Sequence, residues 1–177
     1  MVASAVAKYA TRCFDVCGMF VSVAQTGRLI CSLRTRGMVH PVARRELMEI
    51  VVLDEVRELR DVGEAFLRAL ANRDFEALWA CLQQNVSFRA LVPPGVRQAT
   101  EVSGTVNRFH LWFGEADSFE MLRAEIGQVA HRLSITYRIR LHDSDGWQVI
   151  EQRLYCDVGD DGRISNLNLL CSGFLPE

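Results

Sequence analysis

Three side chains on two predicted strands could do acid–base or hydrogen-bond chemistry: Glu151, Tyr137 and Tyr155. A carboxyl group that faces an apolar cavity has its pKa raised, so Glu151 could act as a general acid or base. The alternative for Glu151 is a salt bridge to Arg138 or Arg153, or a position in water. Tyr155 shares the face of Glu151, because it follows four residues later in the same strand. Either tyrosine could orient a ligand, or could fill the core with one satisfied hydrogen bond.

The histidines and cysteines indicate neither a metal site nor a catalytic nucleophile. His110 lies in a predicted helix and His131 at a strand start, both without an Asp or Cys partner, while His142 belongs to a hairpin. The six cysteines form no CxxC motif and no Cys/His pair at zinc spacing. Phosphate-binding loops, GxSxG and HExxH are also missing from the sequence. We therefore expect free thiols in a reducing cytoplasm, and no cofactor or metal.

Charge is divided unevenly along the chain. Residues 1–45 carry a net charge of +6 and residues 46–177 a net charge of −8. An acidic body lacks the basic surface by which proteins neutralise nucleic-acid phosphates, so we expect no nucleic-acid partner. The apolar run at residues 16–24 is too short to span a bilayer and follows Asp15, which argues against a secretory signal and a membrane partner. A single lysine beside 19 arginines is typical of GC-rich bacterial coding.

Residues 1–47 are predicted to be a poorly defined basic extension, and residues 48–177 a single domain. The extension could be a basic tail, a short accessory helix, or residues upstream of the true start. Met38 and Met48 are both plausible alternative starts, and Met48 opens the periodic part of the sequence.

Three amphipathic helices are predicted in the domain. The first covers residues 54–71, Asn72 can cap the second, and Gly104 leads into the third. Their apolar residues recur at three- and four-residue steps. These residues are Val56, Leu59, Val62, Phe66, Ala69 and Leu70 in the first helix, Phe75, Leu78, Trp79 and Leu82 in the second, and Val106, Phe109, Trp112 and Phe113 in the third.

Alternation of apolar and polar residues predicts the strands. The first begins at Val86 and is ended by Pro93-Pro94-Gly95, and a short strand follows near residues 98–102. Asp/Gly turns at residues 143–146 and 159–162 separate the later strands of an antiparallel meander. These later strands cover residues 119–126, 132–141, 147–157 and 164–171. The predicted fold class is α+β, with a bent sheet wrapped by helices.

Four stretches carry a family resemblance: residues 72–78 (NRDFEAL) through 86–88 (VSF), Trp112-Phe113-Gly114, residues 151–155 (EQRLY) and residues 162–174. In order and spacing they resemble the nuclear transport factor 2-like superfamily, and within it the polyketide-cyclase-like and ketosteroid-isomerase-like branch. The resemblance covers about residues 54–175. It implies a cone-shaped, cystatin-like curved sheet, mixed or antiparallel, wrapped by about three helices, with an apolar pocket and a homodimer. It does not fix an activity, because this fold hosts isomerases, cyclases, hydrolases and binders.

Two of the three catalytic groups of the ketosteroid isomerases are missing at the matching positions. Ala90 stands where their aspartate base would lie, and Phe66 where their helix tyrosine would lie. Only the third position keeps a carboxyl group, as Glu151. The epoxide hydrolases of the superfamily activate water with an Asp-Arg-Asp set, which lacks its second inward aspartate here. The strands offer Arg138, Arg140 and Asp157.

Two functions follow as hypotheses. In the first, the chain binds an apolar small molecule, and Glu151 serves as acid or base with Tyr137 or Tyr155 as the orienting donor. In the second, the chain is a non-catalytic dimeric module whose cavity is filled by its own side chains, and the outer face of the sheet binds a second copy or another partner. The residues expected to line the cavity are Phe66, Phe88, Ala90, Phe109, Trp112 and Leu169.

Overall fold

The computed structural model describes the backbone of residues 22–23, 29–30 and 41–177 and the side chains of residues 56–177. The chain divides into two units, Met1–Glu46 and Leu47–Glu177. In the first unit, strands β1 (Ser22–Val23) and β2 (Leu29–Ile30) form an antiparallel pair. The rest of the predicted extension up to residue 40 lies outside the described residues. This part includes most of the apolar run at residues 16–24.

Helix α1 (Pro41–Ala71) is longer than the sequence predicts, because it begins at Pro41 and the predicted helix begins at residue 54. In the predicted apolar stripe, Leu59, Phe66, Ala69 and Leu70 are buried and Val62 is half-buried, whereas Val56 is 43% exposed. The chain then turns at Arg73, whose φ of 52° is in the left-handed region and stops the helix. Helix α2 (Phe75–Ala80) follows, and its cap is Asp74 rather than the predicted Asn72. The carboxylate of Asp74 accepts a hydrogen bond from the backbone N–H of Ala77 at 2.9 Å.

Strand β3 (Leu82–Val92) begins earlier than predicted. The spacing of Leu82 predicts a place in the second helix, but Leu82 is the first residue of β3 and is buried in the core. After Pro93-Pro94, strand β4 (Gly95–Ala99) runs back antiparallel to β3. Helix α3 (Val102–Phe113) then begins at a turn in which the hydroxyl of Thr105 donates to the carbonyl oxygen of Glu101.

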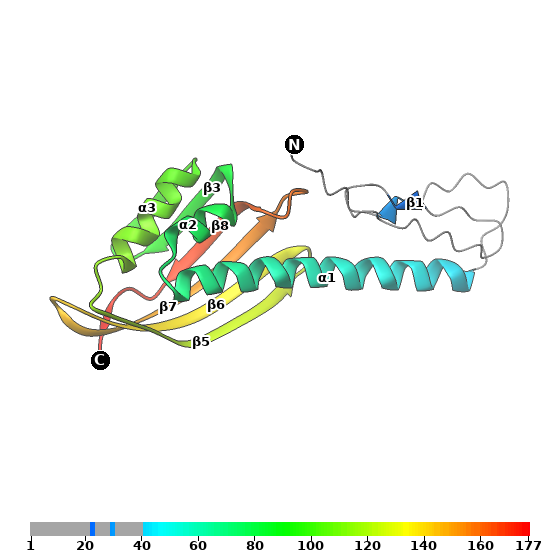
Figure 1. Cartoon of the computed structure of the whole chain (residues 1–177). Coiled ribbons are helices and arrows are strands. Elements are labelled where there is room, and N and C mark those ends of the chain that lie inside the picture. The colour runs from blue at the N-terminus through cyan, green and yellow to red at the C-terminus, as the bar shows by residue number, and fades with distance from the viewer. Residues whose placement is uncertain (1–21, 24–28, 31–40) are drawn as a thin grey trace, which may run out of the picture. The chain divides into compact units, whose positions relative to one another are not determined.

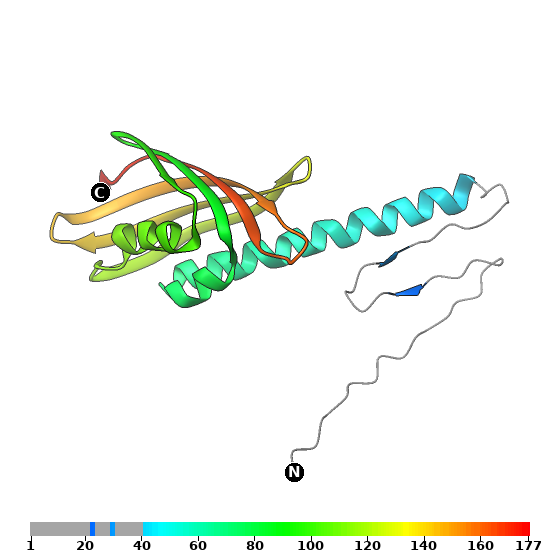
Figure 2. The same cartoon turned by 90° about the horizontal axis from the view of Figure 1, so that it is seen from above.

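One curled, unclosed sheet contains the remaining strands, in the order β4-β3-β8-β7-β6-β5, with β9 paired to β7. The predicted meander from β5 to β8 is antiparallel, and β3 pairs with β8 in parallel, so the sheet is mixed. Figures 1 and 2 show the helices lying along one side of this curved sheet. The strand bounds are β5 (Ser118–Val129), β6 (Arg132–Asp143), β7 (Gly146–Val158), β8 (Ile164–Cys171) and β9 (Leu175–Pro176).

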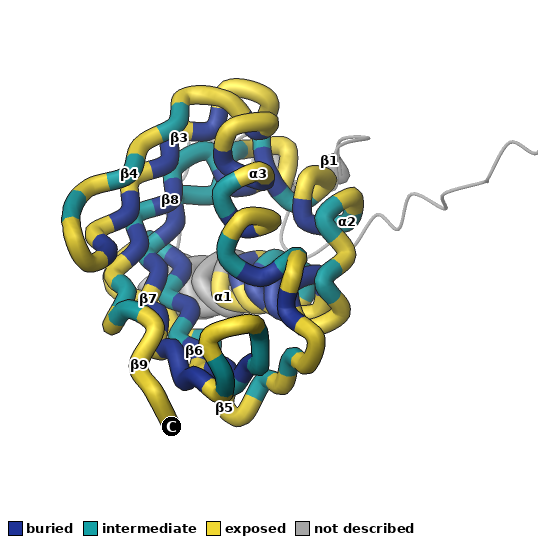
Figure 3. The backbone as a smooth tube through the Cα atoms, turned by 90° about the vertical axis from the view of Figure 1, so that its left-hand side faces the viewer, coloured by how far each residue is buried: buried dark blue, intermediate teal, exposed yellow. Residues whose placement is uncertain are grey.

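The core lies between the helices and the inner face of the sheet. Figure 3 shows buried positions alternating with exposed ones along the strands, as a sheet with one face in the core requires. The predicted α+β class with a curved sheet and three helices is therefore confirmed. Among the described residues, no helix is long and apolar enough to cross a membrane.

Candidate functional site

Aromatic rings fill the interior between α1, α3 and the sheet. Phe109 on α3 is at the centre, with ring centroids 5.8 Å from Phe66, 6.0 Å from Phe88 and 5.6 Å from Trp112. Phe113 extends the cluster, with its ring centroid 6.5 Å from that of Phe109. Contacts of this length are the normal packing of edge-on and tilted rings. The structure thus brings the predicted lining residues together as a packed core, and Ala90 and Leu169 are buried beside them.

The polar groups of the interior come from three neighbouring strands. The hydroxyl of Tyr137 on β6 donates to Oε1 of Gln152 on β7, and Nε2 of Gln152 donates to Sγ of Cys171 on β8 at 3.3 Å. Burial raises the pKa of Tyr137 well above its usual range, so the phenol stays protonated. A neutral phenol held by a neutral amide can donate a hydrogen bond but cannot accept a proton as a general base.

Glu151 lies on the outer face of the sheet, which corrects the expected orientation into the cavity. Its side chain is 60% exposed, and its carboxylate accepts a hydrogen bond from Nη1 of Arg138 at 3.0 Å. Strand residues alternate between faces, so the inward position belongs to the next residue, Gln152. Tyr155 shares the outer face with Glu151, as the spacing predicts, and is half-buried there. The salt bridge to Arg138 is one of the alternatives that the sequence offers for Glu151.

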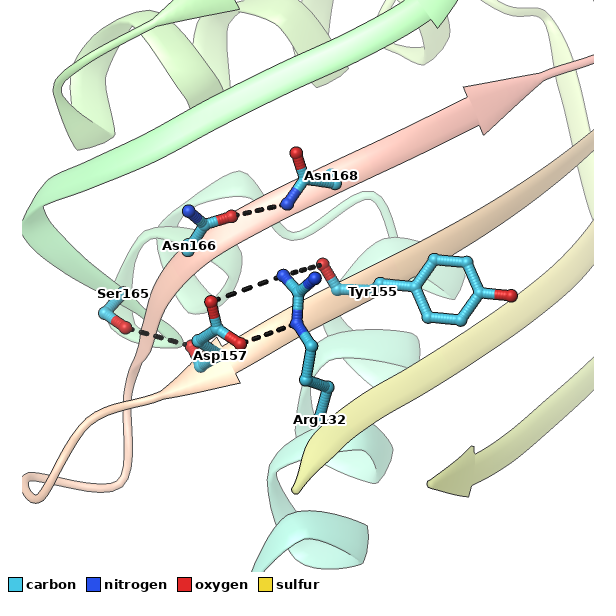
Figure 4. A network of polar contacts seen from close by, with 6 residues as sticks. All are labelled: Arg132, Tyr155, Asp157, Ser165, Asn166 and Asn168. Carbon is cyan, nitrogen blue, oxygen red and sulfur yellow. Dashed lines mark hydrogen bonds and ion pairs between the residues drawn. The ribbon is translucent and has the colours of Figure 1, made fainter. Parts of the chain in front are cut away.

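A second set of polar contacts covers the outer face near Tyr155 (Figure 4). The guanidinium of Arg132 binds the carboxylate of Asp157 through Nε at 2.6 Å and Nη2 at 3.3 Å, and Nη2 also reaches the carbonyl oxygen of Tyr155. On β8, Nδ2 of Asn168 donates a hydrogen bond to Oδ1 of Asn166 at 2.6 Å. Figure 4 shows the phenol ring of Tyr155 extending away from the Arg132–Asp157 pair.

Two hollows lie on the outside of the domain. One, of about 540 Å³, is bounded by α1, α2 and the β7–β8 turn. Cys81 lines it, and burial raises the pKa of this thiol although Arg68 opposes the shift, which favours the thiol over the thiolate. The other hollow, of about 470 Å³, lies on the outer face of β5, β6 and β7 and includes Tyr155. Neither is lined by the interior aromatic rings.

His110 and His131 are exposed, and His142 is half-buried on its hairpin. The ring of His110 packs on Phe75 at 4.8 Å, and Nδ1 of His142 lies 3.6 Å from the carboxylate of Asp117. In the part of the chain that the structure describes, no group of three or more His, Cys, Asp or Glu side chains could hold a metal ion.

The inward residues Gln152 and Cys171 were missed from the sequence, although a signal was present. Ile150, Leu154 and Cys156 have the same parity as Gln152 in β7, and all three are apolar. That pattern assigns the inner face to the even-numbered residues and the outer face to Glu151.

Comparison with solved structures identifies the fold. The chain is similar to an LEH-like epoxide hydrolase from M. tuberculosis, with 21% identity and a TM-score of 0.52 over 67% of this chain and 85% of that one. It is also similar to a putative polyketide cyclase from Xanthomonas campestris, with 13% identity and a TM-score of 0.53 over 66% and 91%. An NTF2-like protein from Burkholderia xenovorans matches at 10% identity and a TM-score of 0.51, again over 66% and 91%.

These likenesses confirm the resemblance to the nuclear transport factor 2-like superfamily at the level of the fold. No protein-family model and no curated protein matches the chain. At such low identity the fold is what is shared, and the chemistry has to be argued from the residues of this chain.

Proposed function

We propose that this chain is a non-catalytic interaction module that forms a homodimer through the outer face of its sheet. The observation that carries the proposal is the filled interior. Phe66, Phe88 and Phe109 are each at most 2% exposed, and Phe109 packs against both of the others. Side chains therefore occupy the space in which an apolar ligand would lie. The interior polar groups Tyr137 and Gln152 are bonded to each other, which also favours the module over a pocket enzyme.

An exposed apolar row on the outer face supplies the surface for association. Leu91 on β3 lies directly opposite Val96 on β4 and beside Leu170 on β8 in the register of the sheet. These three side chains, the apolar row, are 52%, 45% and 51% exposed. Contiguous exposed apolar residues on neighbouring strands are costly in water and typically mark an interaction surface.

A second copy of the chain suits this surface in shape and charge. In a twofold interface the same patch meets itself, so an apolar row on one copy finds an apolar row on the other. The row carries no charge, so two copies do not repel each other there. Strands β4, β3, β8 and β7 have 5, 11, 8 and 13 residues. At about 3.3 Å per residue and about 4.8 Å between strands, their outer face covers roughly 590 Å². Two such patches bury about 1,200 Å², which is at the lower end of the usual range for a stable interface.

The oligomeric state tests this proposal. We expect the full chain to sediment as a dimer and the Leu91→Arg variant as a folded monomer, because a buried unpaired charge at the centre of an interface is strongly unfavourable. Leu111→Arg is the matched control, since Leu111 is an exposed leucine on α3, away from the sheet. A monomeric wild-type chain, or a Leu91→Arg variant that remains dimeric, would contradict the proposal.

Ligand binding tests the filled interior separately. Steroid-like and aromatic polyketide compounds should change neither the melting temperature nor the tryptophan fluorescence, in which Trp112 reports from the edge of the interior. A saturable change in either signal, abolished by a substitution in the interior, would restore the pocket hypothesis.

A further inference from the structure

The hollow on the outer face of β5, β6 and β7 has an unusual lining. Its volume is about 470 Å³, and its wall includes Ser134, Thr136, Arg153 and Tyr155. Gly127 on β5 contributes to the depth of the hollow, because no atom lies within 4 Å of the place where a Cβ would be. The other lining residues are Glu125, Ile126 and Val129.

Four of these residues form a compact set of hydrogen-bond donors, here called the donor quartet: Ser134, Thr136, Arg153 and Tyr155. In the register of β6 and β7, Thr136 is directly opposite Arg153, and Ser134 is directly opposite Tyr155. Opposite side chains in such a pair begin about 5 Å apart, so all four point outward from one small area. Within residues 56–177, none of the four side chains makes a hydrogen bond or an ion pair.

Arg153 differs in this respect from the arginines around it. Arg123 pairs with Glu125, Arg132 with Asp157, and Arg138 with Glu151. Arg153 lies among these pairs, and no carboxylate of residues 56–177 pairs with it. Because the carboxylate of Glu125 at the rim of the hollow is neutralised by Arg123, the guanidinium of Arg153 gives the donor quartet a net positive charge.

We propose that the donor quartet binds the phosphoryl group of a small phosphomonoester. A guanidinium offers two parallel N–H groups to an oxyanion, and three hydroxyls can donate to the remaining oxygens. A phosphoryl group has three terminal oxygens to accept these bonds, whereas a carboxylate has two. The quartet therefore satisfies a phosphomonoester more completely than a carboxylic acid.

The rest of the hollow indicates what the organic part of the ligand resembles. The hollow is larger than a phosphoryl group needs, and Val129 and Tyr155 supply its apolar wall, since the side chain of Ile126 faces α1 on the inner side of the sheet. A planar apolar body can stack on the phenol ring while its phosphoryl group faces Arg153. The hollow shares β7 with the proposed dimer surface, and Arg153 lies beside Leu170 at the border of the apolar row.

Calorimetric titration of the full chain with phenyl phosphate at low salt tests the site. We expect saturable binding that Arg153→Gln weakens at least about tenfold, because a charge-assisted bidentate contact is lost. Arg89→Gln is the matched control, since Arg89 borders the apolar row as Arg153 does, makes no ion pair within residues 56–177 and lies outside the hollow. The affinity of the Arg89→Gln variant for phenyl phosphate should stay within about twofold of that of the wild type.

Several results would overturn the proposal. One is the absence of saturable binding of phenyl phosphate. Another is an equal loss of affinity for phenyl phosphate in Arg89→Gln and Arg153→Gln. A third is benzoate that binds as tightly as phenyl phosphate. Arg153-dependent binding of vesicles that contain phosphatidate, without binding of phenyl phosphate, would assign the site to a lipid headgroup and reject a soluble ligand. The monomeric Leu91→Arg variant should retain the affinity, because one copy holds the whole quartet. Loss of binding in that variant would contradict a site complete in one copy, whatever the outcome for the dimer.

Discussion

Tyr137 and Gln152 occupy opposite positions on β6 and β7, and the phenol of one donates to the amide oxygen of the other inside the core. Both side chains are almost completely buried. A buried polar pair of this kind stabilises the fold only while both partners are present, because a lone buried acceptor has lost its water without gaining a bond.

Removing the hydroxyl of Tyr137 should therefore be costly. We expect Tyr137→Phe to lower the free energy of unfolding by about 1–3 kcal/mol in urea denaturation. Tyr155→Phe is the control, and it should change stability by less than about 0.5 kcal/mol because the Tyr155 hydroxyl has no partner among the described residues. Adding Gln152→Leu to Tyr137→Phe should recover part of the loss. Similar losses in the two tyrosine variants would contradict this account.

Cys156 makes the free energy of unfolding fall as the pH becomes alkaline. Burial raises the pKa of this thiol to about 12. The unfolded thiol releases its proton near pH 9, whereas the folded one keeps it, so this contribution is complete below about pH 9 and is lost as the pH rises toward about 12.

The expected loss is up to about 1.4 kcal/mol for each pH unit in that window. Urea denaturation between about pH 9 and pH 10 should give a shallower slope for Cys156→Ala than for the wild type. The buried phenol of Tyr137 is present in both chains, so its own alkaline effect cancels in the comparison. Equal slopes would show that Cys156 does not titrate differently in the two states.

Phe109→Ala should open the interior. Loss of the central ring should destabilise the fold by about 3–5 kcal/mol, against less than about 0.5 kcal/mol for Leu111→Ala on the exposed side of the same helix. The space left behind is lined by rings and should bind a small aromatic molecule such as benzene. Benzene should thus raise the melting temperature of Phe109→Ala and leave that of the wild type unchanged. An equal rise in both would mean that the native interior already holds a cavity.

The sequence predicts the elements of this fold more reliably than their ends and faces. Hydrophobic periodicity and Asp/Gly turns locate the helices and the later strands, since burial of one face determines both patterns. Leu82 was misassigned because one apolar residue fits either period at the junction of a helix and a strand. The capping residue moved from Asn72 to Asp74 because the left-handed turn at Arg73 shortens the second helix.

The candidate site was harder to predict for a physical reason. A shift of one residue moves every side chain of a strand to the other face, so Glu151 and Gln152 exchange roles when a match is carried over without the apolar pattern of β7. The donor quartet was beyond reach from one sequence, because its members belong together only through the pairing of β6 with β7. The sequence suggests Arg153 only as a salt-bridge partner for Glu151, and in the structure Arg138 is that partner.

The parallel pairing of β3 with β8 has a consequence for synthesis of the chain. Ala90 pairs with Leu169, so two distant stretches of the polypeptide must meet before the sheet is complete. The hairpins from β5 to β7 connect neighbours and can form as soon as they emerge, whereas contacts between distant segments form slowly. On the ribosome, β3 therefore has only β4 as a partner until β8 has been released.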